Sequence, residues 1–379
     1  MALVLNEEQR LLKDTAKDFL SSTMPVSELR ALRDSGDTHG YKPDHWQAMC
    51  ELGWSGIVFP EEFGGLDFGY LGLGAIFEQT GRTLAASPLL STVVLSASLI
   101  QLAASEQQKQ ELLPAIISGE LTLALALEEG HHHAPTAIQT QAEKTADGYI
   151  LNGRKSVVLD ASSADKLVVI ARTNKDSNGS EGLSAFLVNS QVKGITQHSK
   201  QWVDSRSASE IIFENVQLSD ADLLGEADQI WPALNIALDR SRICLAAEML
   251  GGALECFERT VAYLKERDQF GQKIGSFQAL QHRAAILFTE LELAKSVVLD
   301  ALSAIDDKRP DLPQLASLAK ARLNDVFEKV TSEAVQMHGG IGVTDELEIG
   351  FFLKRSRVAT QLFGNSGFHR DRYATLCGY

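Results

Sequence analysis

The hydrophobic pattern of this chain changes its period twice, and this switch limits the folds open to it. Up to about residue 120, apolar residues recur with the helical period of about 3.6, as Ala16 and Leu20 illustrate. From about Leu121 the chain breaks into short runs rich in Val, Ile and Leu, bounded by Asn, Asp, Gly and Ser, as strands are. After Leu224-Gly225 the helical period returns and lasts almost to the end.

This order predicts an α+β multidomain protein. We expect an N-terminal helical domain over 1–120, a middle β-barrel or sandwich over 121–226, and a C-terminal helical bundle over 227–379. Expected helices lie near 71–82, 87–118, 230–267, 276–305, 311–337 and 344–361, and expected strands near 123–127, 148–159, 167–172, 183–188 and 210–213. Asn6 with Gln9 is a capping-box pattern, and Asn152-Gly153 is typical of a tight hairpin turn.

Composition excludes several classes of protein. The formal charge of −15 disfavours nucleic acids and anionic membranes as partners, because both attract basic surfaces. The four cysteines are scattered without a Cys-x-x-Cys pair, so we expect buried free thiols rather than a disulfide framework. No apolar run approaches the about 20 residues of a membrane span, and the acidic start is unlike a signal peptide, so we expect a cytoplasmic protein.

Two motifs in the C-terminal third carry most of the information about function. The first runs from Arg267-Asp268-Gln269-Phe270-Gly271-Gln272-Lys273-Ile274 through Phe277-Gln278 to Gln281-His282. The second, Gln336-Met337-His338-Gly339-Gly340-Ile341-Gly342, follows a helix rather than a strand and lacks a βαβ context, so it is a poor Rossmann motif. A guanidinium matches phosphate oxygens, and glycines let a backbone approach a ligand closely.

Together these motifs resemble the FAD-binding half of the acyl-CoA dehydrogenases, and Pro60-Glu61-Glu62-Phe63-Gly64-Gly65 is similar to the family's P-E-x-x-G-G stretch. The resemblance spans the whole chain and implies the fold expected above. It also implies that FAD is bound by Arg267, which in the family reaches a neighbouring subunit's cofactor, and by seven further residues. These are Gln269, Phe270, Phe277, Gln278, Gln336, Gly339 and Gly340.

The family also implies partners. We expect an acyl-CoA substrate, an acceptor like the electron-transfer flavoproteins, and a homo- or hetero-oligomer, a dimer or tetramer, that shares the FAD site between subunits. The strand region departs from the family: Glu128-Glu129-Gly130-His131-His132-His133-Ala134 and Val157-Val158-Leu159 replace a Gly-rich loop and a Trp-Ile-Thr run that hold the flavin ring. The three consecutive histidines are a poor metal site, because neighbours in a strand point to opposite faces. We expect a solvent-facing loop there.

The most unusual departure concerns the catalytic base. Where the family carries a glutamate in a Tyr-Glu-Gly-Thr run, this chain has Leu362-Phe363-Gly364-Asn365, and the alternative position on the long helix is Ser241. A phenyl ring cannot accept the α-proton of a thioester. Asp239 is a weak candidate for a relocated base. By the same resemblance, Asp239, Arg242 and Gly364 are the expected substrate-binding residues, although Asp239 and Arg242 also suit an exposed helical pair.

Three functions follow as hypotheses. The chain is the base-lacking subunit of a heteromeric flavoprotein for α,β-dehydrogenation of an acyl-CoA thioester, similar to the small subunits of the pimeloyl-CoA and steroid side-chain dehydrogenases. The first alternative is a self-sufficient FAD-dependent dehydrogenase or oxidase with an atypical base or none. The second is a non-catalytic structural partner that binds no FAD. Flavin absorption separates the last hypothesis from the others, and turnover without a partner separates the first two.

Overall fold

A computed structural model describes residues 4–379, which group by their contacts into two compact units. The first unit contains the chain up to Ala31, Gly69–Ala85 and Arg242–Tyr379, and the second contains Leu32–Phe68 and Ala86–Ser241. The long helix α7 (Trp231–Glu266) and the short α2 (Val26–Ser35) each continue from one unit into the other. The bounds of the three predicted domains therefore stay a prediction, although the α–β–α order of elements is the expected one.

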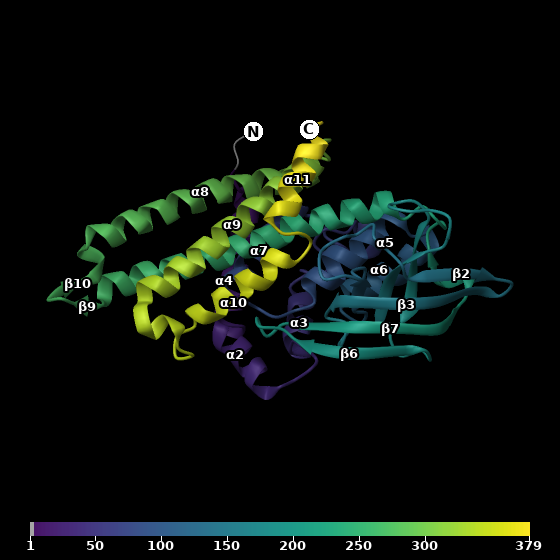
Figure 1. Cartoon of the computed structure of the whole chain (residues 1–379), viewed down its shortest axis with the longest axis horizontal. Helices are drawn as coiled ribbons and strands as arrows, with labels where there is room; N and C mark the ends of the chain where they lie inside the picture. The colour runs from purple at the N-terminus through teal and green to yellow at the C-terminus, as the bar shows by residue number, and fades with distance from the viewer. Residues whose placement is uncertain (1–3) are drawn as a thin grey trace. The chain divides into compact units, whose positions relative to one another are not determined.

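The first unit is a bundle of long helices (Figure 1). Besides a small hairpin described below, its other elements are α1 (Glu7–Thr23), α4 (Tyr70–Thr83), α8 (Gln278–Asp306), α9 (Leu312–His338), η5 (Gly339–Val343), α10 (Ile349–Gln361) and α11 (Ser366–Leu376). The predicted capping box at the start of α1 is confirmed, since the Asn6 side chain accepts from Gln9 N at 2.8 Å. Pro232 lies in the first turn of α7, where its missing N–H costs little.

Glycines allow α4 and α7 to cross at very short range. A Cβ added to Gly81 would lie 1.9 Å from the Glu248 carbonyl oxygen, and one added to Gly251 would lie 1.7 Å from that of Glu78. Nearby, Arg355 of α10 donates to both carboxylate oxygens of Glu248, at 2.9 and 3.1 Å, with both side chains almost fully buried. Close backbone contact and a buried bidentate ion pair thus fix α7 between its neighbours.

The second unit combines short helices with one sheet. The helical elements are α3 (Pro43–Glu51), η1 (Glu61–Phe63), the π-helix η2 (Leu89–Ala97), α5 (Ser98–Ala103), α6 (Glu106–Ile117) and η3 (Asp220–Asp222). The stretch predicted as one helix over 87–118 is therefore three elements. The interruption falls where Ser105 caps α6 by bonding Gln108 N, a local signal that the apolar pattern concealed.

The sheet has eight strands, β1 (Leu123–Ala126), β2 (Gln141–Thr145), β3 (Gly148–Leu159), β4 (Lys166–Arg172), β5 (Leu183–Asn189), β6 (Ile195–Gln201), β7 (Ser207–Leu218) and β8 (Leu223–Leu224). Its order is β6-β7-β3-β2-β4-β5-β8, and β1 pairs with β4 in parallel. Among the described residues this path does not close, so the sheet is not a barrel. Most neighbours are antiparallel, and Leu151, Phe186 and Phe213 lie in its apolar core.

The predicted hairpin at Asn152-Gly153 is wrong. Both residues lie inside β3, and the chain turns instead between β2 and β3, just before Gly148. Gly153 has φ 150°, and β3 changes register against β7 between Leu151 and Gly153, which marks a bulge. A hypothetical Cβ on Gly153 would lie 2.5 Å from Thr140 Oγ1, so the glycine serves a close contact rather than a turn.

Two smaller observations complete the fold. Among residues 4–379, every helix is too short or too polar to cross a lipid bilayer. Three cysteines are buried free thiols as expected, whereas Cys377 is exposed. Burial raises the pKa of the Cys50 thiol to about 11, so that thiol stays protonated at neutral pH.

Candidate cofactor and thioester sites

The residues of the first motif surround a small hairpin at one end of the helical bundle (Figure 1). Arg267 follows the last residue of α7, and the chain then forms β9 (Asp268–Gln269), β10 (Gln272–Lys273) and η4 (Ile274–Ser276) before α8 begins at Gln278. Ile274 N donates to the Arg267 carbonyl at 2.9 Å and closes the hairpin. Gln269 and Gln278 are exposed, Phe277 is half-buried, and Phe270 is 88% exposed.

The second motif reaches the same end of the bundle. α9 ends at His338, whose ring stacks on that of Tyr263 from α7, with centroids 4.4 Å apart. Tyr263 Oη also donates to the His338 carbonyl at 3.4 Å. Gln336, Gly339 and Gly340 are exposed just beside this contact. The sequence gives no reason for Tyr263 to join the two motifs, since its position follows only from the packing of α7 on α9.

The end of the bundle that carries the β9–β10 hairpin and Gly339–Gly340, here called the hairpin end, has the groups that bind an anionic nucleotide. Within residues 4–379, the Arg267 guanidinium forms no ion pair, so its donors remain available. A Cβ added to Gly339 or Gly340 would meet nothing within 4 Å, and Gly339 has φ 65°. An exposed guanidinium, two open glycines and the exposed ring of Phe270 suit the pyrophosphate and adenosine of FAD. These residues therefore fit the cofactor that the resemblance implies.

The second candidate site is the turn formed by residues 362–365, here called the 362–365 turn. It joins the end of α10 to α11, and Asn365 caps α11 by accepting from Phe368 N at 3.0 Å. Phe363 has φ 56° and Gly364 has φ 112°, so both residues lie on the left-handed side of backbone space. Phe363 is 8% exposed.

Two buried cations bind consecutive carbonyl groups of this turn. Arg242 Nε of α7 donates to the Phe363 carbonyl at 3.3 Å, and Lys320 Nζ of α9 donates to the Gly364 carbonyl at 3.2 Å. Asn324, one turn further along α9, also donates to Gly364, at 3.4 Å. Lys320 and Asn324 were missed by the sequence analysis, because a lysine inside an amphipathic helix is ordinarily assigned to its solvent face.

The other candidate positions lie on α7. Asp239 and Arg242 are each 1% exposed, so the prediction of an exposed helical pair is wrong. Ser241 is fully buried, and its hydroxyl donates to the Ala237 carbonyl at 2.8 Å, which engages it with its own helix. Asp239 thus places a carboxylate in the buried interior of α7, whereas the Ser241 side chain has no carboxylate and its hydroxyl proton is engaged by Ala237.

The Glu129 carboxylate anchors the loop that follows β1. Glu129 accepts from Lys155 Nζ of β3 at 2.7 Å and from Gln139 N at 2.7 Å. Lys155 is fully buried, and this burial lowers its pKa to about 8. Burial opposes ionisation of Glu129 as well, but Lys155 and the hydrogen bonds from Thr140 and Gln139 together outweigh it and lower the pKa of that carboxyl group. The ion pair fixes the start of the loop to the sheet.

The histidines of this loop differ in their surroundings. His131 and His132 are exposed, as expected of a solvent-facing loop, whereas His133 bonds through Nδ1 to the Glu128 carboxylate and its side chain is 3% exposed. Ser156 of β3 donates to the Glu128 and Gly130 carbonyls, at 3.2 and 2.9 Å. The predicted departure at Val157-Val158-Leu159 corresponds to the aliphatic end of β3, which pairs with the loop at Glu128.

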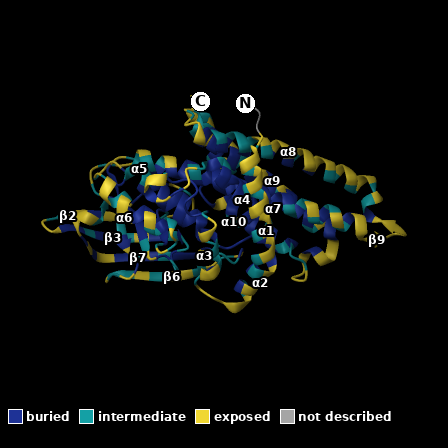
Figure 2. Ribbon diagram, turned by 180° about the vertical axis from the view of Figure 1, so that it is seen from behind, coloured by how far each residue is buried: buried dark blue, intermediate teal, exposed yellow. Residues whose placement is uncertain are grey.

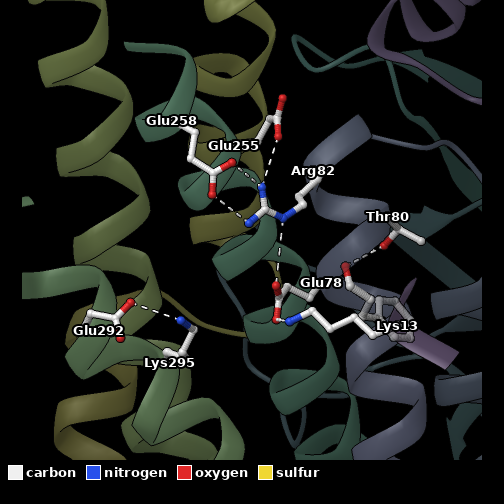
Figure 3. Close-up of polar contacts among 9 residues, drawn as sticks. Lys13, Glu78, Thr80, Arg82, Glu255, Glu258, Glu292 and Lys295 are labelled. Carbon is white, nitrogen blue, oxygen red and sulfur yellow. Dashed lines mark hydrogen bonds and ion pairs between the residues drawn. The ribbon is translucent and has the colours of Figure 1, made fainter. Parts of the chain in front are cut away.

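A cavity of about 610 Å³ in the first unit is a third candidate, but its two half-buried cations Arg82 and Lys13 are already paired. It lies among α1, α4, α7 and α8, and Figure 3 shows its ion pairs. Arg82 donates to Glu258 at 2.9 and 3.0 Å and to Glu255 at 3.2 Å, while Lys13 donates to Glu78 at 2.7 Å. An anionic ligand would have to displace these carboxylates, so the cavity is a poor phosphate site.

Comparison with known proteins covers nearly the whole chain. Family models for the N-terminal, middle and C-terminal domains of acyl-CoA dehydrogenase match residues 6–120, 124–216 and 231–375. A probable acyl-CoA dehydrogenase, YngJ of Bacillus subtilis, is 31% identical over 98% of both chains. The CarC subunit of the caffeyl-CoA reductase-Etf complex of Acetobacterium woodii is 30% identical over 96% of both.

A solved structure agrees with this sequence similarity. The butyryl-CoA dehydrogenase of Megasphaera elsdenii superposes with a TM-score of 0.90 and 26% identity, covering 100% of both chains. Similarity therefore extends from end to end and includes the order of helices and strands.

Proposed function

Because the chain belongs to the acyl-CoA dehydrogenase family, we propose that it is a flavoprotein subunit that binds FAD and an acyl-CoA thioester but supplies no carboxylate base. The observation that carries this proposal is the 362–365 turn. Its carbonyls are anchored by Arg242 and Lys320, while the residue at its centre is Phe363. The proposed site thus has an anchored backbone but no carboxylate at residue 363.

The reaction explains why this matters. Dehydrogenation removes a proton from the α-carbon of the thioester and transfers a hydride from the β-carbon to the bound flavin, the one oxidant the reaction needs. A positioned base contributes about 10²–10⁴-fold to such a proton transfer. Phe363 has no basic atom, and the Ser241 hydroxyl bonds its own helix. We therefore propose that a partner subunit provides the carboxylate, in a heteromeric assembly.

We propose that the residues of the hairpin end bind FAD. Arg267 would neutralise the pyrophosphate of FAD, Phe270 would pack against its adenosine arm, and Gly339 and Gly340 would admit its backbone contacts. The hairpin is exposed, which suits a site completed by a neighbouring chain. The similarity to the CarC subunit of an Etf complex supports an electron-transferring flavoprotein as acceptor.

Purified chain, alone and together with candidate partner subunits, tests the proposal. We expect the assembly to contain FAD, the lone chain to reduce an artificial acceptor very slowly with saturated acyl-CoAs, and activity to appear with a glutamate-bearing partner. Turnover by the lone chain at ordinary dehydrogenase rates would contradict it. A chain that never retains flavin, in any assembly, would favour the purely structural role instead.

The buried carboxylate of Asp239 favours a second candidate, a self-sufficient enzyme with a relocated base. Asp239 is 1% exposed on α7, two residues from Ser241, which is about 200° around a helix. If the lone chain is active, Asp239→Asn should abolish turnover with FAD still bound. Unchanged turnover in that variant would remove Asp239 from consideration.

A further inference from the structure

Among residues 4–379, the fully buried Lys320 side chain has no carboxylate partner, and burying an amine without one is unfavourable. Its side chain is fully buried between α9, α10 and the 362–365 turn. Its ammonium group donates to Asn324 Oδ1 at 2.6 Å, to the Ala359 carbonyl at 2.9 Å and to the Gly364 carbonyl at 3.2 Å. A leucine or methionine would fill the same space without desolvating a charge.

The three acceptors match the three N–H donors of an ammonium group, whereas a neutral amine has only two. Burial and the guanidinium groups of Arg242 and Arg355 lower the pKa of Lys320 well below its ordinary value. The oxygens oppose this shift, and Ala359 contributes one of the last carbonyls of α10, where a helix carries partial negative charge. The hydrogen-bond pattern therefore favours the protonated form.

The hydrogen bonds of Lys320 connect three segments: α9, the end of α10 and the 362–365 turn. Lys320 ties the end of α10 to Gly364, and Asn324, held by Lys320, donates to the same Gly364 carbonyl. The neighbouring Phe363 carbonyl is bound by Arg242 from α7. Two consecutive carbonyls are thus bound by donors on two different helices, in a turn whose residues 363 and 364 have positive φ values of 56° and 112°.

We propose that Lys320 is the positioning residue of the 362–365 turn, and that it holds this turn in the conformation that receives an acyl-CoA thioester, a role that rests on the function proposed above. Removing the ammonium leaves the Ala359 carbonyl and Asn324 Oδ1 without this donor, and leaves Gly364 only the longer bond from Asn324. The 362–365 turn then keeps only the longer Asn324 bond to α9, while the hairpin that is proposed for FAD keeps all its contacts.

Lys320→Met tests the proposal, because methionine nearly preserves the volume and removes only the charge and donors. Thr331→Val is the matched control: Thr331 is also buried on α9, and its hydroxyl lies 3.1 Å from Ser356 Oγ of α10, away from the turn. The readouts are hydrogen exchange of the amides in residues 362–368, flavin content, and the affinity for butyryl-CoA and octanoyl-CoA by calorimetry.

We expect Lys320→Met to accelerate exchange at the turn by about tenfold or more, the scale of a lost charge-assisted hydrogen bond, and to weaken acyl-CoA binding similarly. Flavin content should not change, and Thr331→Val should leave the turn and the affinity as they are. Equal exchange in the two variants would overturn the positioning role. Faster exchange with unchanged acyl-CoA affinity would overturn its part in binding.

The same measurements distinguish a failure of the proposed acyl-CoA function from a failure of the positioning role of Lys320. If the unmodified assembly binds neither acyl-CoA while Lys320→Met still loosens the turn, then the anchor is real and the acyl-CoA function is wrong. Should Lys320→Met fail to fold, Asn324→Leu replaces it, because it removes one acceptor of Lys320 and the second donor to Gly364. Unchanged exchange at the turn in Asn324→Leu would then overturn the proposal.

Discussion

Restoring a carboxylate at residue 363 is the most direct perturbation of this protein. The anchored carbonyls of Phe363 and Gly364 keep the backbone in place, so Phe363→Glu should present a glutamate without rebuilding the turn. We expect the lone chain to gain about 10²–10⁴-fold in acyl-CoA-dependent reduction of an artificial acceptor, the usual contribution of a positioned base. The positive φ at this residue is borne equally by phenylalanine and glutamate, so it adds no new strain.

Phe363→Glu is also expected to lower the free energy of unfolding, so the assay temperature must be chosen with care. Phe363 is 8% exposed, and losing a buried ring costs about 3 kcal/mol. Thermal melts therefore set the temperature at which the variants are compared. Phe363→Gln is the control, since it has the shape of glutamate without its basicity and should stay inactive. If Phe363→Glu retains FAD and binds acyl-CoA but is no faster than Phe363→Gln, the assignment of this turn to the base position is refuted.

Three further predictions follow from charged residues. Arg267→Ala should weaken FAD retention by about 1.5–3 kcal/mol, because a phosphate loses its charge-assisted partner; unchanged flavin stoichiometry in the purified assembly would contradict this. Lys155→Met should destabilise the fold by about 3 kcal/mol in urea melts, the low end for a broken buried ion pair, since it leaves the partly buried Glu129 without its cation, and adding Glu129→Gln should recover part of the loss. Lys155 has a pKa of about 8 when folded and 10.5 as its ordinary value. Between these two pH values the unfolded chain binds more protons than the folded chain, so the contribution of Lys155 to the free energy of unfolding rises with pH. Urea melts of the unmodified chain and of Lys155→Met at pH about 8 and 10 would detect this rise.

The fold was predictable because long stretches repeat one signal. The capping box at Asn6, the helical period and the strand runs each agree with the observed elements. The hairpin at Asn152-Gly153 failed for a physical reason: a positive φ is needed in a bulge as well as in a turn, and the dipeptide alone does not distinguish them. The order of the strands in the sheet could not be predicted, because strand pairing depends on contacts between residues distant in sequence.

The candidate site was predictable only in part. Motif residues such as Arg267 and Gly339 could be named because their local sequence resembles the FAD motifs of the family, and their role stays a prediction. Lys320 could not, because the sequence does not show that a lysine points inward toward the end of another helix. The burial of Asp239 was equally hidden: in a helix as long as α7, apolar residues surround every position, and charge alone predicts exposure.

The exposed apolar residues of α8 and the hairpin have a consequence for how the chain must be produced. Ile286, Phe288 and Leu293 are 52–55% exposed and Phe270 is 88% exposed, and Figure 2 shows much of α8 and β9 in the exposed class. Ile286 and Leu293 are seven residues apart and so share a helical face. We expect a chain synthesised without its neighbours to be prone to aggregation, and its melting temperature to rise with chain concentration as association covers this surface.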